Sequence, residues 1–181
     1  MGNILNKKIT LVPIGESDRE KFIKDLQDAF TVAVVEEFGE ATQEVIPQTD
    51  IEESMDAKGA ETYHILLDGS IVGGTVLVID PKTRRNSLDL LFIRANEHSR
   101  DHSKGIGLSA WKAIEQLHPE TEVWETHTPY FEKRNIHFYI NKCGFHIVEF
   151  YNPHHLDLHI PAANFESSEY FFRFEKVMKR T

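Results

Sequence analysis

Two glycines, Gly105 and Gly107, stand directly before a run of apolar residues with helical spacing, and strand-like segments flank that run on both sides. The segment before it is Ser87–Ile93, and the segment after it is Glu122–Thr128. A strand, a helix and a second strand of one sheet form a crossover, which makes the two strands parallel. This order restricts the chain to a mixed α/β fold with a parallel strand pair.

Two helices are predicted in the N-terminal part, after a short strand at residues 9–14. The first helix has a capping-box pattern at its start and a glycine at its end, and the second follows Pro47. The predicted boundaries are Ser17, whose capping box includes Glu20, and Gly39 for the first helix, and Thr49 or Asp50 and Gly59 for the second.

A three-strand antiparallel meander is predicted next. Asp68 and Gly69, a residue pair typical of tight hairpins, separate its first two strands. Gly73 and Gly74 lie inside the second strand and indicate a bulge or a close approach of another backbone. The three predicted strands are Tyr63–Leu67, Ser70–Ile79 and Ser87–Ile93.

The C-terminal part predicts one more helix, followed by two strands. The helix covers residues 134–142, and Gly144 is suited to its left-handed C-cap. The strands are Phe145–Tyr151 and Glu169–Met178. Because the chain has 181 residues and contains no repeat or linker, we expect a single domain that covers residues 1–181.

The composition excludes several classes of function. The net charge is −9, whereas a general nucleic-acid-binding protein needs a basic surface. No apolar run approaches the roughly 18 residues of a membrane span, so we expect no membrane partner. Cys143 is the single cysteine and has no intramolecular partner for a disulfide, which favours a reducing, cytoplasmic location.

The glycine turn fits two kinds of phosphate site, because a turn that opens a helix offers backbone N–H groups at the positive end of the helix dipole. Gly105, Gly107 and Ala110 satisfy the dinucleotide fingerprint, and Glu125 lies near the place of its ribose contact. That fingerprint needs its glycines immediately after a strand, whereas residues 94–104 separate them from the preceding strand. The pyrophosphate of coenzyme A is the other candidate.

Two motifs resemble those of the GNAT-type N-acetyltransferases. HSKGIG (residues 102–107) resembles the superfamily's [QR]-x-x-G-x-[GA] pyrophosphate motif, with His102 in the place of glutamine or arginine. NIHFYINKCGF (residues 135–145) resembles its helix that carries a tyrosine and ends in G-F, and the order of the predicted elements agrees as well. The resemblance covers essentially the whole chain and implies a GNAT-like fold: a mixed, mostly antiparallel central sheet, with a parallel pair splayed at the coenzyme A site, flanked by helices.

The resemblance implies acetyl-CoA as the acetyl donor and no metal. The amides from Lys104 to Leu108 would hold the pyrophosphate, and Phe92 and Ile93 would pair with the pantetheine arm through their main chain. Asn135 matches a family asparagine of the cofactor region, and an N-cap of its own helix is the alternative. The implied cofactor-binding residues are Phe92, Ile93, His102, Ser103, Lys104, Gly105, Ile106, Gly107, Leu108 and Asn135.

The implied reaction is direct transfer of the acetyl group to a primary amine. Tyr139 is matched to the tyrosine of the family's FY-x-x-x-GF pattern, which implies that it is the general acid, since a phenol can protonate a thiolate of similar basicity. Asp89 and Glu125, on two predicted strands, are the candidates for the general base. The alternative is a catalytically inactive, CoA-binding regulatory or interaction protein with the same fold.

The acceptor is the least constrained part of the prediction. Acidic residues around Glu36 and Glu37 favour a small cationic amine over a protein N-terminus, and a solvated helix face is the alternative. Residues 94–104 form a loop longer than is usual for the family, which either helps to hold the adenosine 3′-phosphate or contacts a second subunit of a homodimer. The histidines that follow Pro153 have no thiolate pair or H-E-x-x-H motif beside them, which favours surface or acceptor-site roles over a metal site.

Overall fold

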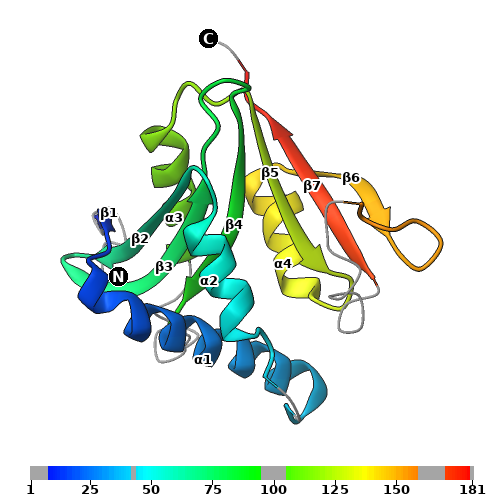
Figure 1. The fold of residues 1–181 in the computed structure, drawn as a ribbon, viewed down its shortest axis with the longest axis horizontal. Coiled ribbons are helices and arrows are strands. Elements are labelled where there is room, and N and C mark those ends of the chain that lie inside the picture. The colour runs from blue at the N-terminus through cyan, green and yellow to red at the C-terminus, as the bar shows by residue number, and fades with distance from the viewer. Residues whose placement is uncertain (1–7, 42–43, 95–104, 159–169, 180–181) are drawn as a thin grey trace, which may run out of the picture. The chain divides into compact units, whose positions relative to one another are not determined.

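The computed structural model describes residues 8–41, 44–94, 105–158 and 170–179. The order of its elements is the predicted one, apart from a 3₁₀ turn before the first helix and a π-helix near the C-terminal end (Figure 1). The elements are β1 (Ile9–Pro13), η1 (Glu16–Asp18), α1 (Arg19–Phe38), α2 (Gln48–Asp56), β2 (Ala60–Leu67), β3 (Ser70–Val78), β4 (Arg85–Ile93), α3 (Ile106–Leu117), β5 (Val123–Pro129), α4 (Lys133–His137), the π-helix η3 (Phe138–Cys143), β6 (His146–Tyr151) and β7 (Phe171–Val177).

The strands form a seven-stranded sheet in the order β1-β2-β3-β4-β5-β7-β6. The pairs β1–β2, β2–β3, β5–β7 and β6–β7 are antiparallel. The pair β4–β5 is parallel, with Arg85–Ser87 opposite Val123–Glu125. The predicted fold class, a mostly antiparallel α/β sheet with one parallel pair and flanking helices, is therefore confirmed.

The chain forms two compact units. The first comprises Met1–Asp80 and Leu88–Pro119, and the second comprises Pro81–Ser87 and Glu120–Thr181. None of the helices in the described part of the chain is long and apolar enough to cross a membrane. The single domain 1–181 stays a prediction.

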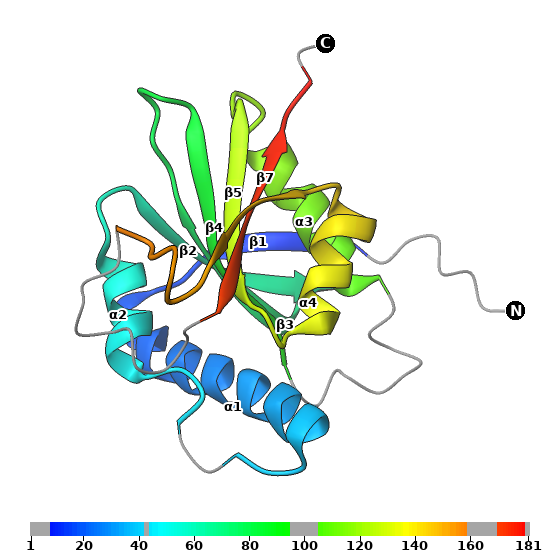
Figure 2. The same cartoon turned by 90° about the vertical axis from the view of Figure 1, so that its right-hand side faces the viewer.

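In the first unit, helices pack on both faces of the strands (Figure 2). The core beneath α1 and α2 joins Phe22 and Ile51 of these helices to Val76 of β3. A separate core lies beneath α3, where Ala110 packs with Ile65 of β2. The alternation of apolar side chains in the meander strands supplies both cores, because successive residues of a strand point to opposite faces.

Both N-terminal helices begin differently from the prediction. The capping box at Ser17 is wrong, since Asp18 is the N-cap of α1 and makes no side-chain capping bond. Asp18 already has helical backbone angles, and its N–H bonds to the carbonyl of Gly15, so the 3₁₀ turn leads directly into the helix. For α2 the N-cap is Pro47, whose carbonyl accepts the N–H of Asp50, and the helix ends at Asp56 before the turn of Gly59.

The glycine predictions in the meander and at two helix ends are confirmed. Asp68 and Gly69 both have positive φ, 49° and 86°, as a tight hairpin requires. The register of β2 against β3 shifts beside Gly73, and a Cβ on that residue would lie 2.1 Å from the backbone oxygen of Phe92 in β4. Gly39 and Gly144 end their helices in the left-handed conformation.

Candidate active site

The glycine turn opens α3 as the sequence predicts. Gly105 is the N-cap of this helix and has a φ of 89°, a conformation that residues with a Cβ rarely adopt. Among the described residues, no atom beyond its chain neighbours lies within 4 Å of the place where a Cβ would stand. In the described part of the chain, no side-chain hydrogen bond caps the helix there. The first backbone N–H groups of α3 thus suit an anion such as a pyrophosphate.

The apolar face of α3 anchors the helix behind this turn. Ile106 and Ala110 are buried and pack with Ile65 of β2 and Val72 of β3. A helix held in this way keeps its N-terminal amides in place without help from a ligand. The predicted residues Gly107 and Leu108 lie in the first turn of α3, whereas His102, Ser103 and Lys104 lie outside the described residues.

The end of β4 carries the two residues that are predicted to pair with the pantetheine arm. Phe92 is buried, and its ring lies edge-on to that of Phe22 with 5.3 Å between the ring centroids. Ile93 packs in the core beneath α3. Both side chains belong to the apolar cores, so a contact with a cofactor would have to use the main chain, as the resemblance implies.

Tyr139 lies on η3 in the second unit and faces β5. Its side chain is 7% exposed and packs between the rings of Phe145 and Phe174, with 5.7 Å between centroids in each pair. Burial raises the pKa of the phenol to about 12, while a hydrogen bond with Thr126 acts in the opposite direction. The phenol therefore keeps its proton throughout the neutral range, as a general acid must.

The helix that carries Tyr139 is wider than an α-helix. Four residues, 140–143, separate Tyr139 from Gly144, so the match to the FY-x-x-x-GF pattern is one residue out. The structure absorbs the additional residue in η3, a π-helix that runs from Phe138 to Cys143. A one-residue insertion typically produces such a wide turn and leaves the residues on either side of it in place.

Asn135 is the third residue of α4, and the N-cap of that helix is Glu132. The N-cap alternative for Asn135 is therefore wrong. Its side-chain nitrogen donates a hydrogen bond to the hydroxyl of Thr128 on β5, at 3.4 Å. A role of Asn135 in cofactor binding stays a prediction.

The two faces of β5 separate Tyr139 from Glu125. Thr126 and Thr128 are buried and bond to Tyr139 and Asn135, so the face they share looks toward α4 and η3. Glu125 directly precedes Thr126 in the sequence and must therefore point to the opposite face of the strand. Within the second unit, the predicted acid and this candidate base are thus not brought together.

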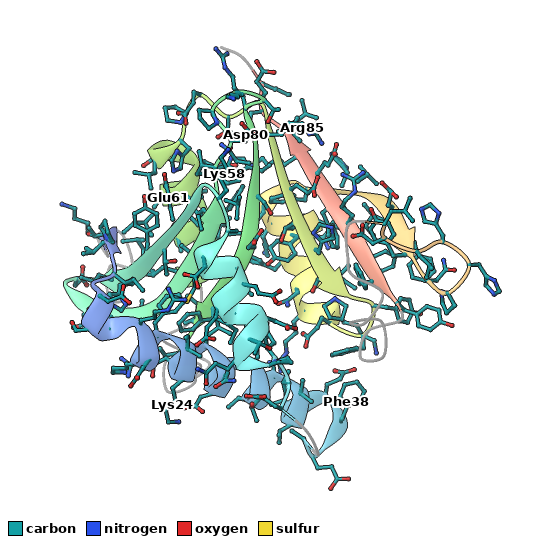
Figure 3. All side chains as sticks on the ribbon, viewed as in Figure 1. Lys24, Phe38, Lys58, Glu61, Asp80 and Arg85 are labelled. Carbon is teal, nitrogen blue, oxygen red and sulfur yellow. The ribbon has the colours of Figure 1, made fainter. Side chains whose placement is uncertain are left out.

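Glu125 belongs to a cluster of charged side chains, which we call the Arg173 cluster: Arg85, Glu125, Glu149, Arg173 and Glu175. The Arg173 guanidinium donates to Glu125 at 3.0 Å, to Glu175 at 2.6 Å and to Glu149 at 2.7 Å. Arg85, at the start of β4 (Figure 3), is ion-paired with Glu175 and lies 3.9 Å from Glu125. Although burial favours the protonated form of Glu175, hydrogen bonds from Arg173 and Arg85 lower its pKa.

Sequence reasoning missed the Arg173 cluster, although one signal for it exists. In β7, Phe172 and Phe174 alternate with Arg173 and Glu175, which indicates one apolar and one charged face. The partners on β5 and β6 depend on the strand register, which the sequence does not reveal. The structure places Glu125 of β5 opposite Glu175 of β7. Arg173 of β7 stands opposite His127 of β5 on one side and opposite Glu149 of β6 on the other.

Asp89, the other candidate base, lies on β4 in the first unit and is exposed. Its carboxylate accepts a hydrogen bond from the hydroxyl of Ser54 on α2, at 2.8 Å. Glu125 is thus ion-paired with Arg173, whereas Asp89 accepts a hydrogen bond from an alcohol.

The acidic end of α1 is exposed, as predicted for either a solvated face or a negative rim. Glu36 and Glu37 are exposed there, and the neighbouring Phe38 is 55% exposed at the end of the helix (Figure 3).

Among the histidines considered as metal ligands, His155 contacts Glu149 at 3.1 Å, while His98, His102 and His159 lie outside the described residues. In the described part of the chain, no group of three or more His, Cys, Asp or Glu side chains is placed to hold a metal ion.

The chain is similar to one protein over nearly its full length. It is 52% identical over 180 residues to the uncharacterized protein YrkN of Bacillus subtilis (strain 168), with 96% of this chain and 95% of YrkN covered. No family model matches the sequence.

Solved structures with similar folds include several acetyltransferases. The ribosomal-protein-S18-alanine N-acetyltransferase from Escherichia coli has a TM-score of 0.66 and is 8% identical, with 96% of each chain covered. The spermidine N-acetyltransferase from Vibrio cholerae in complex with CoA and spermine has a TM-score of 0.60 at 11% identity, covering 93% of this chain and 95% of that one. An acetyltransferase from Bacillus subtilis in complex with CoA has a TM-score of 0.58 and is 17% identical. The match covers 96% of this chain and 100% of the other.

Proposed function

Since the chain belongs to the same family as YrkN of Bacillus subtilis and has the GNAT N-acetyltransferase fold, we propose that it is an N-acetyltransferase that transfers an acetyl group from acetyl-CoA directly to a primary amine. The observation that carries this proposal is the start of α3. Its N-cap, Gly105, is left-handed, and none of the described residues caps the helix with a side-chain hydrogen bond. Acetyl-CoA supplies an acetyl group that its thioester already activates, so the protein has to bind, orient and move protons.

The main chain of the first unit is assigned to cofactor binding. The amides from Ile106 to Leu108 would hold the pyrophosphate, and a negative group there would gain from the helix dipole. The backbone of Phe92 and Ile93 would pair with the pantetheine arm. The solved structures from Vibrio cholerae and Bacillus subtilis that contain CoA support this choice of ligand for the fold.

Two side chains are assigned to proton transfer. Tyr139 protonates the departing sulfur, since its phenol carries a proton at neutral pH, and burial makes it a weaker acid than an ordinary phenol. Asp89 accepts the proton of the amine, directly or through water, because its carboxylate is exposed on β4. Glu125 would have to compete with Arg173 for the same oxygen atoms, so we assign it to the charged cluster instead.

The acceptor is proposed to be a small amine, preferably a cationic one. The exposed carboxylates of Glu36 and Glu37 at the end of α1 support a positively charged acceptor. The spermidine enzyme shows that this fold can serve such an amine in another protein. A cytoplasmic location and a homodimer remain predictions from the sequence.

The proposed cofactor site is tested by placing a side chain at the start of α3. In Gly107→Val, a β-branched side chain would stand where the cofactor must approach the main chain, and we expect calorimetry to detect no acetyl-CoA binding. Gln116→Val is the matched control, since it adds the same side chain to an exposed position in the last turn of the same helix. Normal affinity in Gly107→Val, or an equal loss in Gln116→Val, would show that the N-terminus of α3 is not the cofactor site.

A further inference from the structure

Thr126 carries a buried hydroxyl group that takes no part in the two proton transfers assigned to Tyr139 and Asp89. It lies on β5, is 1% exposed and stands opposite Phe174 of β7. Its side chain is hydrogen-bonded to the phenol of Tyr139. A buried hydroxyl is normally paired, and here its partner is the group to which we assign the proton transfer.

We propose that Thr126 is the positioning residue of the general acid, and that its hydroxyl fixes the direction of the Tyr139 phenol from the neighbouring strand. This inference rests on the proposed function, because it gives Thr126 a role only through Tyr139. The rings of Phe145 and Phe174, which pack against Tyr139, restrict the plane of its ring. A hydrogen bond additionally restricts the position and rotation of the hydroxyl, which ring packing leaves undefined.

The π-helix sets the direction in which the Tyr139 side chain leaves the backbone. Tyr139 is the second residue of η3, whose turn is wider than that of an α-helix, so the direction of its side chain differs from that in an α-helix. The hydroxyl of Thr126 meets the phenol from the regular strand β5.

A second hydrogen bond of the same kind lies one helical turn away. Asn135 precedes Tyr139 by four residues, and Thr128 follows Thr126 by two on the same face of β5. The amide of Asn135 donates to the hydroxyl of Thr128, which is also buried. Helix and strand are therefore joined at two successive points, and the bond of Thr126 is part of a regular contact between α4–η3 and β5.

The same hydroxyl can stabilise the product of the proton transfer. When the phenol acts, its O–H bond breaks, the proton forms an S–H bond at the departing sulfur, and a phenolate remains at Tyr139. An O–H group that donates to this oxygen favours the phenolate, which is the direction of its effect on the Tyr139 pKa. The phenolate then recovers a proton from water before the next turnover. Thr126 itself is neither protonated nor deprotonated.

Substitution of Thr126 tests the proposal in the full chain. Thr126→Val keeps the shape of the side chain and removes the hydroxyl, and we expect kcat to fall roughly tenfold while the KM for acetyl-CoA stays within about twofold. Thr126→Ser keeps the hydroxyl and should restore kcat to near the wild-type value. Thr121→Val is the matched control: Thr121 is 4% exposed and accepts a hydrogen bond from Asn86 at 2.7 Å, so its loss also removes a buried hydroxyl partner.

A spectroscopic measurement keeps the test independent of turnover. With a carbon-13 label at the tyrosine Cζ, the resonance of Tyr139, assigned through Tyr139→Phe, should shift in Thr126→Val and stay in place in Thr121→Val. An unchanged resonance in Thr126→Val would overturn the hydrogen bond itself. A shifted resonance with unchanged kcat would overturn the positioning role. If the wild type acetylates no amine but the resonance shifts, the proposed function fails while the hydrogen bond stands. In that case the catalytic role of Thr126 is refuted as well.

Discussion

Asp89 and Glu125 are two carboxylates whose surroundings suit them to different tasks. Asp89 is exposed and accepts a hydrogen bond from Ser54, whereas Glu125 is ion-paired with Arg173. To take a proton from an amine, a carboxylate must be within reach of the acceptor. The exposed carboxylate of Asp89 meets this requirement better, although composition and strand position make the two residues look alike in the sequence.

Replacing each carboxylate by the amide of the same size distinguishes the role assigned to Asp89, the general base, from that assigned to Glu125, a member of the Arg173 cluster. We expect Asp89→Asn to lower kcat/KM for the amine roughly 100-fold, because the base is lost while the size of the side chain is kept. Glu125→Gln should lower stability, since Arg173 loses a charged partner, but should leave kcat/KM within a few-fold of the wild type. Steady-state kinetics at one fixed pH gives both values. If Glu125→Gln showed the larger loss of kcat/KM, the roles assigned to the two residues would have to be exchanged.

Tyr139 makes the stability of the protein depend on alkaline pH. Its pKa is about 12 in the folded protein, compared with an ordinary value of 10.0, so between these values the unfolded chain loses the proton that the folded protein keeps. The stabilising contribution is complete below pH 10 and is lost as the pH rises toward 12. The shift corresponds to roughly 2–3 kcal/mol in the free energy of unfolding.

Urea unfolding at a series of pH values measures this dependence. Between pH 10 and pH 12, the free energy of unfolding of the wild type should fall more steeply than that of Tyr139→Phe, which has no phenol to titrate. Tyr63, whose pKa is also raised to about 12 by burial and by Glu61, contributes equally to both proteins and cancels in the comparison. Parallel curves for the two proteins would mean that the Tyr139 phenol is not buried.

At the scale of elements, the glycines of β3 decide how closely β4 approaches. A Cβ at Gly73 would lie 2.1 Å from the backbone oxygen of Phe92, so any side chain there would have to push β4 away. Because the same stretch of β4 is assigned to the pantetheine arm, this contact links the packing of the meander to the proposed cofactor site. Gly15 offers a comparison in the same unit, since a Cβ there would find its nearest neighbours at 3.8 Å.

Alanine at the two positions tests this contact. Gly73→Ala should lower the free energy of unfolding by about 3 kcal/mol or more, because a backbone atom cannot move aside without shifting its strand. Gly15→Ala should change it by less than about 0.5 kcal/mol. Both values come from urea unfolding at neutral pH. Equal stability of the two variants would contradict the close approach of β3 and β4.

The order of the elements was predictable because each one has a local signal. The Asp68-Gly69 turn, the strand alternation and the helix ends at Gly39 and Gly144 all act over a few residues, and all are confirmed, whereas the second helix ends at Asp56 and not at Gly59. The start of α1 was not predictable from Ser17, because the preceding 3₁₀ turn satisfies the backbone instead of a side chain. The π-helix also escaped detection, although the additional residue before Gly144 was a signal for it.

The candidate site was less predictable than the fold, because it depends on which faces of the strands come together. The start of α3, to which we assign a backbone role, could be located from the glycine turn alone. The environment of Glu125 could not, since its partners Arg173 and Glu149 lie far away in the sequence and meet it only through the register of β5, β7 and β6. The pairing of Tyr139 with Thr126 likewise depends on how α4 and η3 pack on β5.

At the scale of the whole molecule, the assignments combine the properties of both units. The first unit contains the start of α3, to which we assign anion binding, the C-terminal part of β4 and Asp89. The second contributes Tyr139, held between aromatic rings, and the Arg173 cluster. The fold is that of the GNAT N-acetyltransferases, and the central claim is that this chain also catalyses their reaction.

Release of free thiol from acetyl-CoA, measured over a panel of primary amines, tests that claim most directly. We expect thiol release that requires an amine, with mass spectrometry showing one acetyl group added to that amine. In Tyr139→Phe the rate should fall about 100-fold or more, with unchanged affinity for acetyl-CoA by calorimetry. Normal acetyl-CoA binding without thiol release for any amine would contradict the claim and indicate a CoA-binding protein without catalytic activity.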